Sequence, residues 1–369
     1  MLHILRLASR HARACLIVGL LAGLALPSLA AALAGWLPQM VAALLTITAL
    51  RIGHRAALGA VRDLLWGLAS VVALQTVLPL ALLGGFTLAG LAQTPAALAV
   101  TLAAAAPALT GSVNLALLLR LDAGRMMQLM VLGTAAFPLT VLPVLALLPQ
   151  LGPASDVAQA AMRLLAVILG ATGLGFALRH VFLPRPSARQ IEALDGASVL
   201  AFSVIVVGLM AALNPALRSD PWTVAGWTVL AFALSYLLQA GTLLLTRRGP
   251  LHAVAGPLAI GAGNRNIALF LVALPPEVLA PLMIFIGCWQ LPMYLTPVLL
   301  PRLYERMLST DCLAPHPQRR SLWPVDHLRR EDVRTRQPRR AGISRGGRGT
   351  GLARGARDQH LAGINLRAV

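Results

Sequence analysis

The apolar residues of this chain fall into runs of about 20, the length that an α-helix needs to cross the hydrocarbon layer of a membrane. Short segments that hold most of the arginines separate these runs. Hydrophobic residues make up 57% of the 369 residues and charged residues only 12%, which is unlike a water-soluble domain. The sequence therefore predicts an all-α polytopic membrane protein.

The apolar runs, divided at charge clusters and at Pro and Gly, predict ten transmembrane helices. The first five lie at about 14–33, 37–52, 64–84, 95–120 and 126–148, and the second five at about 157–181, 197–214, 222–246, 251–275 and 278–300. Arginines gather before the first segment and after every even-numbered one, whereas the other connections hold only Arg163 and Arg218. Because cytoplasmic loops carry the excess of arginine, we expect both termini in the cytoplasm and the protein in the cell inner (plasma) membrane.

The N-terminal region allows a second interpretation. Arg6, Arg10 and Arg13 precede an apolar stretch that ends near Ser28-Leu29-Ala30, a pattern that also fits a secretory signal with its cleavage site. Cleavage would remove one helix from the alternating arginine pattern. The alternation therefore favours a first transmembrane helix.

Ten helices divide into two sets of five with opposite orientations, because five is odd. We therefore expect a membrane domain over residues 1–308, built from inverted repeats at about 14–148 and 157–300. The fourth and ninth helices correspond, and both are interrupted by small or polar residues, at Pro107 to Asn114 and at Gly261 to Asn266. Matched interruptions of this kind point to the binding site of a transporter, and we expect the two helices to cross there.

Arg265 is the ionisable residue that the segmentation places deepest in the membrane, where an arginine costs at least about 2.5 kcal/mol. Two compatible interpretations remain open: it bonds carbonyls freed by the break in 95–120, or it contacts an anionic substrate. For Thr110 and Ser112, capping of a half-helix is the favoured alternative. The predicted substrate-binding residues are Arg265, Asn264, Asn266, Asn114, Ser112, Thr110 and Gln290.

Several motifs carry a family resemblance. They are Gln75-x-x-x-Pro79, Ala106-Pro107 before a small polar break, Pro138 with Pro143, and Gly263-Asn264-Arg265-Asn266-x-Ala268-Leu269. Over about residues 14–305 the chain resembles the bile acid:sodium symporter family and its bacterial relatives. The resemblance implies a core of the third to fifth and eighth to tenth helices that moves against a panel of the other four, with substrate bound beside the crossing.

The resemblance also bears on sodium. In the sodium-coupled members, a glutamate that opens the second break and hydroxyls in the fourth and fifth helices help to bind the ion. Here Gly261 stands in the place of that glutamate, Arg265 stands in the place of a glutamine, and Met126 to Met130 offers no hydroxyl. Only Gln75 and Ser112 remain as ion-binding candidates. Sodium coupling is therefore doubtful, and the guanidinium is expected to act as a tethered cation in the sodium position.

The expected function is secondary transport of a small organic anion by alternating access, without a cofactor. No intramembrane Asp, Glu or His is predicted for proton coupling, and no HExxH, GxSxG or Cys/His metal spacing suggests an enzyme or a metal site. The alternatives are a sodium-coupled symporter, as in the family, and a non-transporting membrane ligand sensor. The expected partners are an anionic small molecule and the lipid bilayer.

The net charge of +18 does not indicate a nucleic-acid partner, because thirteen of the 31 basic residues follow Thr310. The Arg-rich cytoplasmic tail, residues 309–369, is predicted to be disordered. Its basic stretch 339–357 suits contact with anionic lipid or RNA. The alternative is an extension with no dedicated partner.

Overall fold

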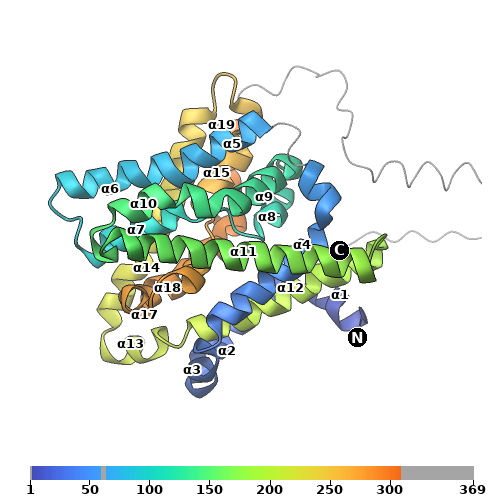
Figure 1. Cartoon of the computed structure of the whole chain (residues 1–369), viewed down its shortest axis with the longest axis horizontal. Helices are drawn as coiled ribbons and strands as arrows, with labels where there is room; N and C mark the ends of the chain where they lie inside the picture. Colours follow the sequence, from blue (N-terminus) through green and yellow to red (C-terminus); the bar gives the residue numbers. More distant parts are fainter. Residues whose placement is uncertain (1, 60–63, 309–369) are drawn as a thin grey trace, which may run out of the picture. The chain divides into compact units, whose positions relative to one another are not determined.

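The computed structural model describes residues 2–59 and 64–308, and the regular elements in that part are all helices, which confirms the predicted all-α class (Figure 1). The predictions for the tail lie outside the described residues. The elements up to residue 151 are α1 (Leu2–Arg10), α2 (Ala12–Ala25), α3 (Pro27–Ala34), α4 (Leu37–Gly59), α5 (Leu64–Val72), η2 (Ala73–Val77), α6 (Leu78–Leu88), α7 (Pro95–Ala105), α8 (Ser112–Leu118), α9 (Ala123–Thr140), α10 (Leu142–Leu147) and η3 (Pro149–Leu151).

The second half has the same character. Its elements are α11 (Ala154–Phe182), α12 (Ala188–Leu209), α13 (Leu213–Ser219), α14 (Pro221–Thr246), η4 (His252–Val254), α15 (Ala255–Gly263), η5 (Ile267–Leu269), α16 (Phe270–Ala273), α17 (Pro276–Leu279), η6 (Ala280–Leu282), α18 (Met283–Leu299) and α19 (Pro301–Leu308).

In the described part, five helical stretches are long and apolar enough to cross a membrane: Leu64–Leu88, Ala154–Phe182, Ala188–Ser219, Pro221–Thr246 and Pro276–Leu299. The number rises to seven if each of two bent pairs is one span, His3–Arg10 with Ala14–Ala25 and Pro27–Ala34 with Leu37–Gly53. Length and composition alone do not establish the ten predicted spans. The segments predicted at 95–120 and 251–275 are each divided into short helices.

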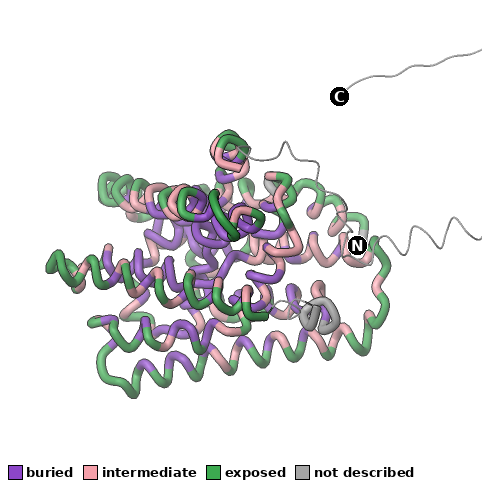
Figure 2. The backbone as a smooth tube through the Cα atoms, turned by 90° about the horizontal axis from the view of Figure 1, so that it is seen from above, coloured by how far each residue is buried: buried purple, intermediate pink, exposed green. Residues whose placement is uncertain are grey.

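The outer faces of these helices are apolar. Leu65, Val229 and Leu245 are 84%, 68% and 85% exposed, and such faces suit contact with lipid chains. In Figure 2 the buried segments gather in the middle of the helices, and the exposed residues lie on their outward sides. The polar side chains buried in that interior include Gln75, Asn264 and Gln290.

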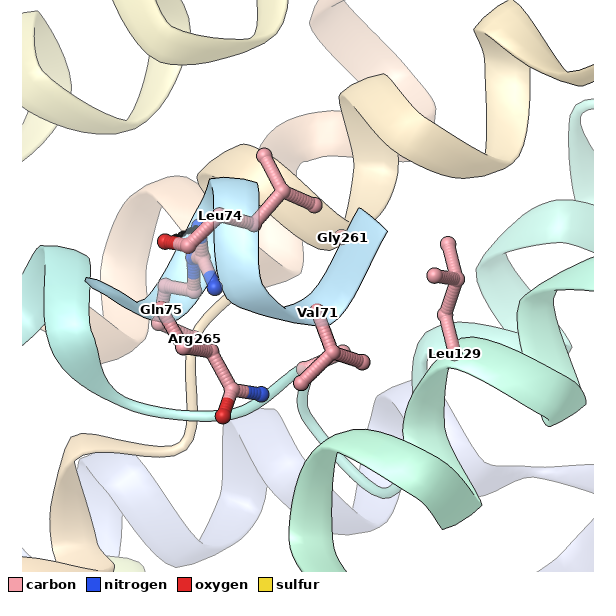
Figure 3. Close-up of a pocket in the computed structure, with 7 residues that line it drawn as sticks. Val71, Leu74, Gln75, Leu129, Gly261 and Arg265 are labelled. Carbon is pink, nitrogen blue, oxygen red and sulfur yellow. Dashed lines mark hydrogen bonds between the residues drawn. The ribbon is translucent and has the colours of Figure 1, made fainter. Parts of the chain in front are cut away.

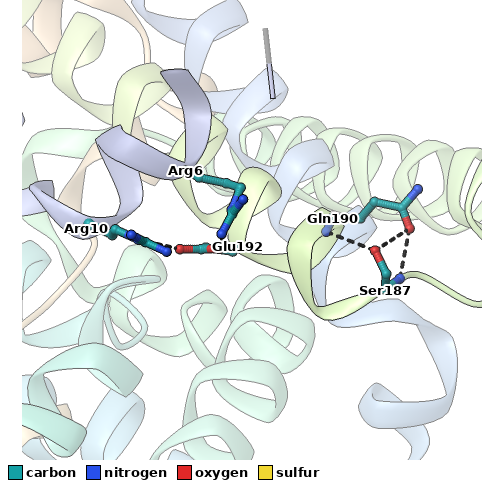
Figure 4. Close-up of polar contacts among 5 residues, drawn as sticks. All are labelled: Arg6, Arg10, Ser187, Gln190 and Glu192. Atoms are coloured by element: carbon teal, nitrogen blue, oxygen red, sulfur yellow. Dashed lines mark hydrogen bonds and ion pairs between the residues drawn. The ribbon is translucent and has the colours of Figure 1, made fainter. Parts of the chain in front are cut away.

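α12 begins at Ala188, nine residues before the predicted start at 197, because a capping box precedes it. The Ser187 hydroxyl accepts from the Gln190 backbone N–H at 3.3 Å, and the Gln190 side chain accepts from the Ser187 N–H at 2.8 Å (Figure 4). The acidic residues of this first part belong to the charge cluster before the predicted segment, and they are paired with arginines. Arg6 and Arg10 contact Glu192 at 2.5 and 2.8 Å, and Arg51 contacts Asp195 at 2.6 Å.

The helices pack in two sets. α12 lies against α1, α2, α3 and α4, and α4 lies along α11. In the other set α14 packs on α15 and α18, while α9 contacts α5, α8 and α15. The sets meet mainly where α11 contacts α9, α10 and α16, where α4 contacts α16, and where α12 contacts α18.

Replacing Gly53 with alanine is expected to destabilise the protein by about 2 kcal/mol, because α4 breaks there at a φ of +73°. An added Cβ would also lie 2.8 Å from Cζ of Arg179, whose guanidinium donates to the carbonyls of Leu50 and Arg51 at 2.8 and 2.6 Å. Equilibrium unfolding in mixed micelles would measure the loss. Gly35→Ala is the control, since its φ is −65° and nothing lies within 4 Å of the added Cβ. Equal stability of the two variants would contradict the prediction.

Candidate functional site

The two interrupted helices meet at their breaks. α7 ends at Ala105 and α15 ends at Gly263. The unwound segments that follow run antiparallel, with Ala108 opposite Arg265 in an isolated bridge. The interruptions predicted at 107–114 and 261–266 therefore lie side by side.

Backbone hydrogen bonds join the two breaks. The Leu109 N–H donates to the Asn264 carbonyl at 2.9 Å, and the Asn266 N–H donates to the Pro107 carbonyl at 2.8 Å. Proline explains why α7 stops here, since it disfavours helical geometry in the preceding residue, and Ala106 has an extended ψ of 149°. Each break thus satisfies part of the backbone that the other leaves free, as a membrane interior requires.

Arg265 is 1% exposed, and its guanidinium bonds three carbonyl groups. Nε donates to Ala262 at 2.8 Å, Nη1 to Ala106 at 2.9 Å, and Nη2 to Leu74 at 3.0 Å. The first two carbonyls belong to the C-terminal ends of α15 and α7, where the helix dipoles are negative. Among the described residues no ion pair includes Arg265. The guanidinium therefore connects both breaks through backbone oxygens.

The third carbonyl is free because η2 is a π-helix. The Leu78 N–H, the usual helical donor to the Leu74 carbonyl, bonds Ala73 instead. The donor one residue later is missing, since Pro79 has no N–H. The proline of the Gln75-x-x-x-Pro79 motif thus leaves Leu74 available to Arg265.

The rest of the second break is bonded by side chains of α14 and α18. Buried polar groups need hydrogen-bond partners, and each backbone carbonyl of residues 262–265 has a donor. The Gly263 carbonyl accepts from Ser235 at 2.9 Å, the Arg265 carbonyl from Trp289 Nε1 at 3.0 Å, and Asn264 Oδ1 from Thr296 at 3.2 Å.

The predicted ion-binding residues have different surroundings. Gln75 is 2% exposed, and its Oε1 accepts from the Thr140 hydroxyl at 2.8 Å. The Thr140 carbonyl in turn accepts from the Thr76 hydroxyl at 2.8 Å. Ser112 is fully buried, and its hydroxyl has no hydrogen-bond partner within the described residues.

The predicted substrate-binding residues separate into a buried group and an accessible one. Arg265 and Asn264 are enclosed, and Asn266 is nearly so. Gln290 is also buried, and its amide bonds the Ile286 carbonyl of its own helix at 3.2 Å. On the first break, Thr110 is partly exposed and Asn114 is exposed. Asn114 shares its open face of α8 with Leu117 and Leu118.

A cavity of about 10 Å³ lies beside the guanidinium (Figure 3). Its lining residues are Val71, Leu74, Gln75, Ala108, Leu129, Gly261 and Arg265. A space of this size holds about one water molecule. An organic substrate therefore needs a different arrangement of the helices or a position outside this cavity.

Sequence reasoning missed the side chains that support the crossing. Thr140, Ser235, Trp289 and Thr296 each bond a group at or next to a break. The sequence does contain a sign of them, because hydroxyl and indole groups in apolar helices must find hydrogen-bond partners inside the protein. The sequence did not show which partners these were.

No family model matches the chain, and a search of curated proteins found no relative. The resemblance to the bile acid:sodium symporter family rests on the motifs quoted above and stays a prediction.

Proposed function

We propose that this protein is a secondary transporter that carries a small organic anion across the inner (plasma) membrane by alternating access. The proposal includes ten spans in two inverted repeats of five, with both termini in the cytoplasm. The observation that carries it is the meeting of two helix breaks around the buried guanidinium of Arg265. Broken helices that meet in the interior are characteristic of transporter binding sites.

The charge at the crossing supports an anionic substrate. Arg265 brings a positive charge into the interior, and no acidic side chain of the described residues pairs with it. Each of the two helix ends carries about half a negative elementary charge. Other donors share it, since Ser235 bonds the Gly263 carbonyl and the Leu109 N–H bonds the Asn264 carbonyl, so the helix ends compensate the guanidinium only in part. An anion beside the crossing would gain from the remaining field, which low-dielectric surroundings strengthen.

The accessible face of α8 supports a polar path next to the crossing. Asn114 is exposed, and an amide that faced only lipid would be unsatisfied. We assign this face to a water-filled path through which substrate approaches. Thr110 and Asn114 then make the first polar contacts, while Arg265 acts on the substrate through its charge.

The surroundings of the guanidinium support transport without sodium. Three backbone oxygens contact Arg265 at 2.8 to 3.0 Å, and oxygen ligands of this kind are what hard cations take. We propose that the guanidinium replaces a soluble cation and stays with the protein throughout the cycle. Substrate transport is then driven by the gradient of the anion itself.

The packing supports two bodies that move relative to each other. Arg51, Asp195 and Arg179 tie α4, α11 and α12 together at one end. The breaks belong to the other helix set, which is joined internally by the bonds around Arg265. The core and panel of the proposed transporter correspond to these two sets.

The test is uptake of a panel of small radiolabelled carboxylates by purified protein in liposomes, with protein-free liposomes as the control. We expect saturable uptake whose initial rate changes less than about twofold when choline replaces sodium, a difference of under about 0.5 kcal/mol. Steep sodium dependence would contradict the tethered cation and indicate a sodium-coupled symporter. Ligand-induced thermal stabilisation without uptake of any carboxylate would contradict transport and indicate a sensor.

A further inference from the structure

A chain of buried polar side chains joins α19 to the second break. Tyr304 is the buried residue of α19, at 2% exposed, and its hydroxyl donates to Oε1 of Gln239 on α14 at 2.8 Å. α19 packs on α14, α15 and α18. The first bond of the chain therefore connects the helix that follows α18 to the interior.

The amide of Gln239 continues the chain toward the break. Its Nε2 donates to the hydroxyls of Ser235 at 3.3 Å and Thr296 at 3.4 Å. The Ser235 hydroxyl donates onward to the Gly263 carbonyl at 2.9 Å. The Thr296 hydroxyl shares its hydrogen between Asn264 Oδ1 at 3.2 Å and the Pro292 carbonyl of its own helix at 2.9 Å. Ser235, Gln239 and Thr296 are fully buried, so water does not compete for these bonds.

The chain has one direction, which the orientation of the Gln239 amide fixes. Tyr304 supplies a hydrogen to Oε1, and this turns Nε2 toward the two hydroxyls. A reversed amide would present its oxygen to Ser235 and Thr296, which would then donate to it instead of to the break. Reversal would also leave the Tyr304 O–H without its acceptor. The tyrosine hydroxyl therefore makes the observed orientation the stable one.

Packing places the same amide directly against the break. A Cβ built on Gly263 would lie 2.4 Å from Cγ and 2.8 Å from Nε2 of Gln239. A change in the orientation of the amide would therefore alter its packing against Gly263 and the backbone next to it.

We propose that Tyr304 is a positioning residue for the second break and acts through Gln239. Its hydroxyl orients the amide. The amide donates to the Ser235 and Thr296 hydroxyls, so Ser235 keeps its hydrogen for Gly263 and Thr296 keeps its hydrogen available to Asn264. The effect of Tyr304 on transport rests on the proposed function, because it requires the second break to be part of a carrier's binding site. The effect on the break itself does not depend on what the protein carries.

The test is hydrogen exchange, measured by mass spectrometry on the purified full chain. Tyr304→Phe removes one hydroxyl, and we expect peptides covering 260–270 to exchange about fivefold faster, as the loss of one net hydrogen bond implies. Gln239→Glu should give the same result with Tyr304 intact, because an ionised carboxylate has no N–H for Ser235 or Thr296. Tyr294→Phe is the matched control, since its hydroxyl donates to Oε1 of Gln290 on its own helix at 3.4 Å, and within the described residues it bonds no member of the chain.

A double substitution separates positioning from a general structural role. In a Gln239→Leu background, Tyr304→Phe should cause no further change at 260–270, because its route to the break has already been removed. Additive effects would overturn the proposal, and so would faster exchange in Tyr304→Phe that is limited to residues 301–308.

Uptake of the carboxylates named under the proposed function is measured on the same variants. Slower uptake in Tyr304→Phe with unchanged exchange at the break would also overturn positioning, whereas absent uptake in the wild type with altered exchange would contradict only the transport function.

Discussion

Replacing Arg265 with methionine is expected to destabilise the protein by about 4 kcal/mol and to abolish uptake. Methionine fills much of the same space but offers no donor to the carbonyls of Leu74, Ala106 and Ala262. Three backbone oxygens would then be buried without partners. The variant no longer has the desolvation cost of a buried charge, but this gain offsets the lost hydrogen bonds only in part. Unfolding in mixed micelles and uptake in liposomes measure the two effects.

Two further substitutions divide this effect between charge and hydrogen bonds. Arg265→Lys retains the charge, but a single nitrogen cannot reach carbonyls on three segments, so we expect an intermediate loss of stability. Arg265→Ala leaves a polar space that water can enter and should destabilise the protein less than methionine does. If Arg265→Met were as stable as the wild type, the guanidinium would not be what holds the breaks together. Full uptake in Arg265→Met or Arg265→Ala would contradict the tethered cation, whereas uptake retained only in Arg265→Lys would agree with it.

The positions of the two helix breaks could be predicted from the sequence. Pro107 and the run Gly261-Ala262-Gly263 interrupt apolar helices, and an interruption must be buried in protein or face water. The interpretation that Arg265 bonds carbonyls freed by the first break agrees with its contact to Ala106. Direct contact of Arg265 with an anion stays a prediction, because the observed bonds all go to backbone.

The rest of the site depends on contacts between distant segments. The Leu74 carbonyl is available because η2 is a π-helix and Pro79 has no N–H, and periodicity does not distinguish one extra residue in an apolar turn. Gln75 suggested an ion ligand, yet its oxygen accepts from Thr140, which lies 65 residues away. A polar residue in an apolar helix shows that a partner exists, but the tertiary fold decides which one.

The predicted start of α12 differs from the observed one for another reason. The predicted segment 197–214 starts after Glu192 and Asp195, because the apolar runs are divided at charge clusters and acidic residues are costly near lipid. Their pairing with Arg6, Arg10 and Arg51 reduces that cost and allows α12 to begin at Ala188. These arginines come from the first quarter of the chain, so the local sequence around 192 gives no sign of them.

The close approach of α14 and α15 leads to a last expected result, at a pair of glycines in one helix. A Cβ on Gly263 would lie 2.3 Å from the backbone oxygen of Ser235, whereas a Cβ on Gly261 meets nothing nearer than Met126 Cε at 3.6 Å. We therefore expect Gly263→Ala to cost about 3 kcal/mol, because backbone must move to admit the methyl group. Gly261→Ala should be neutral or stabilising by up to about 1 kcal/mol, since alanine favours the helix. Unfolding of both variants in mixed micelles is the measurement, and equal tolerance of the two would show that the helices do not touch at the break. Because the added group is the same and the sites are two residues apart, a difference of this size reflects the distance of each site from α14.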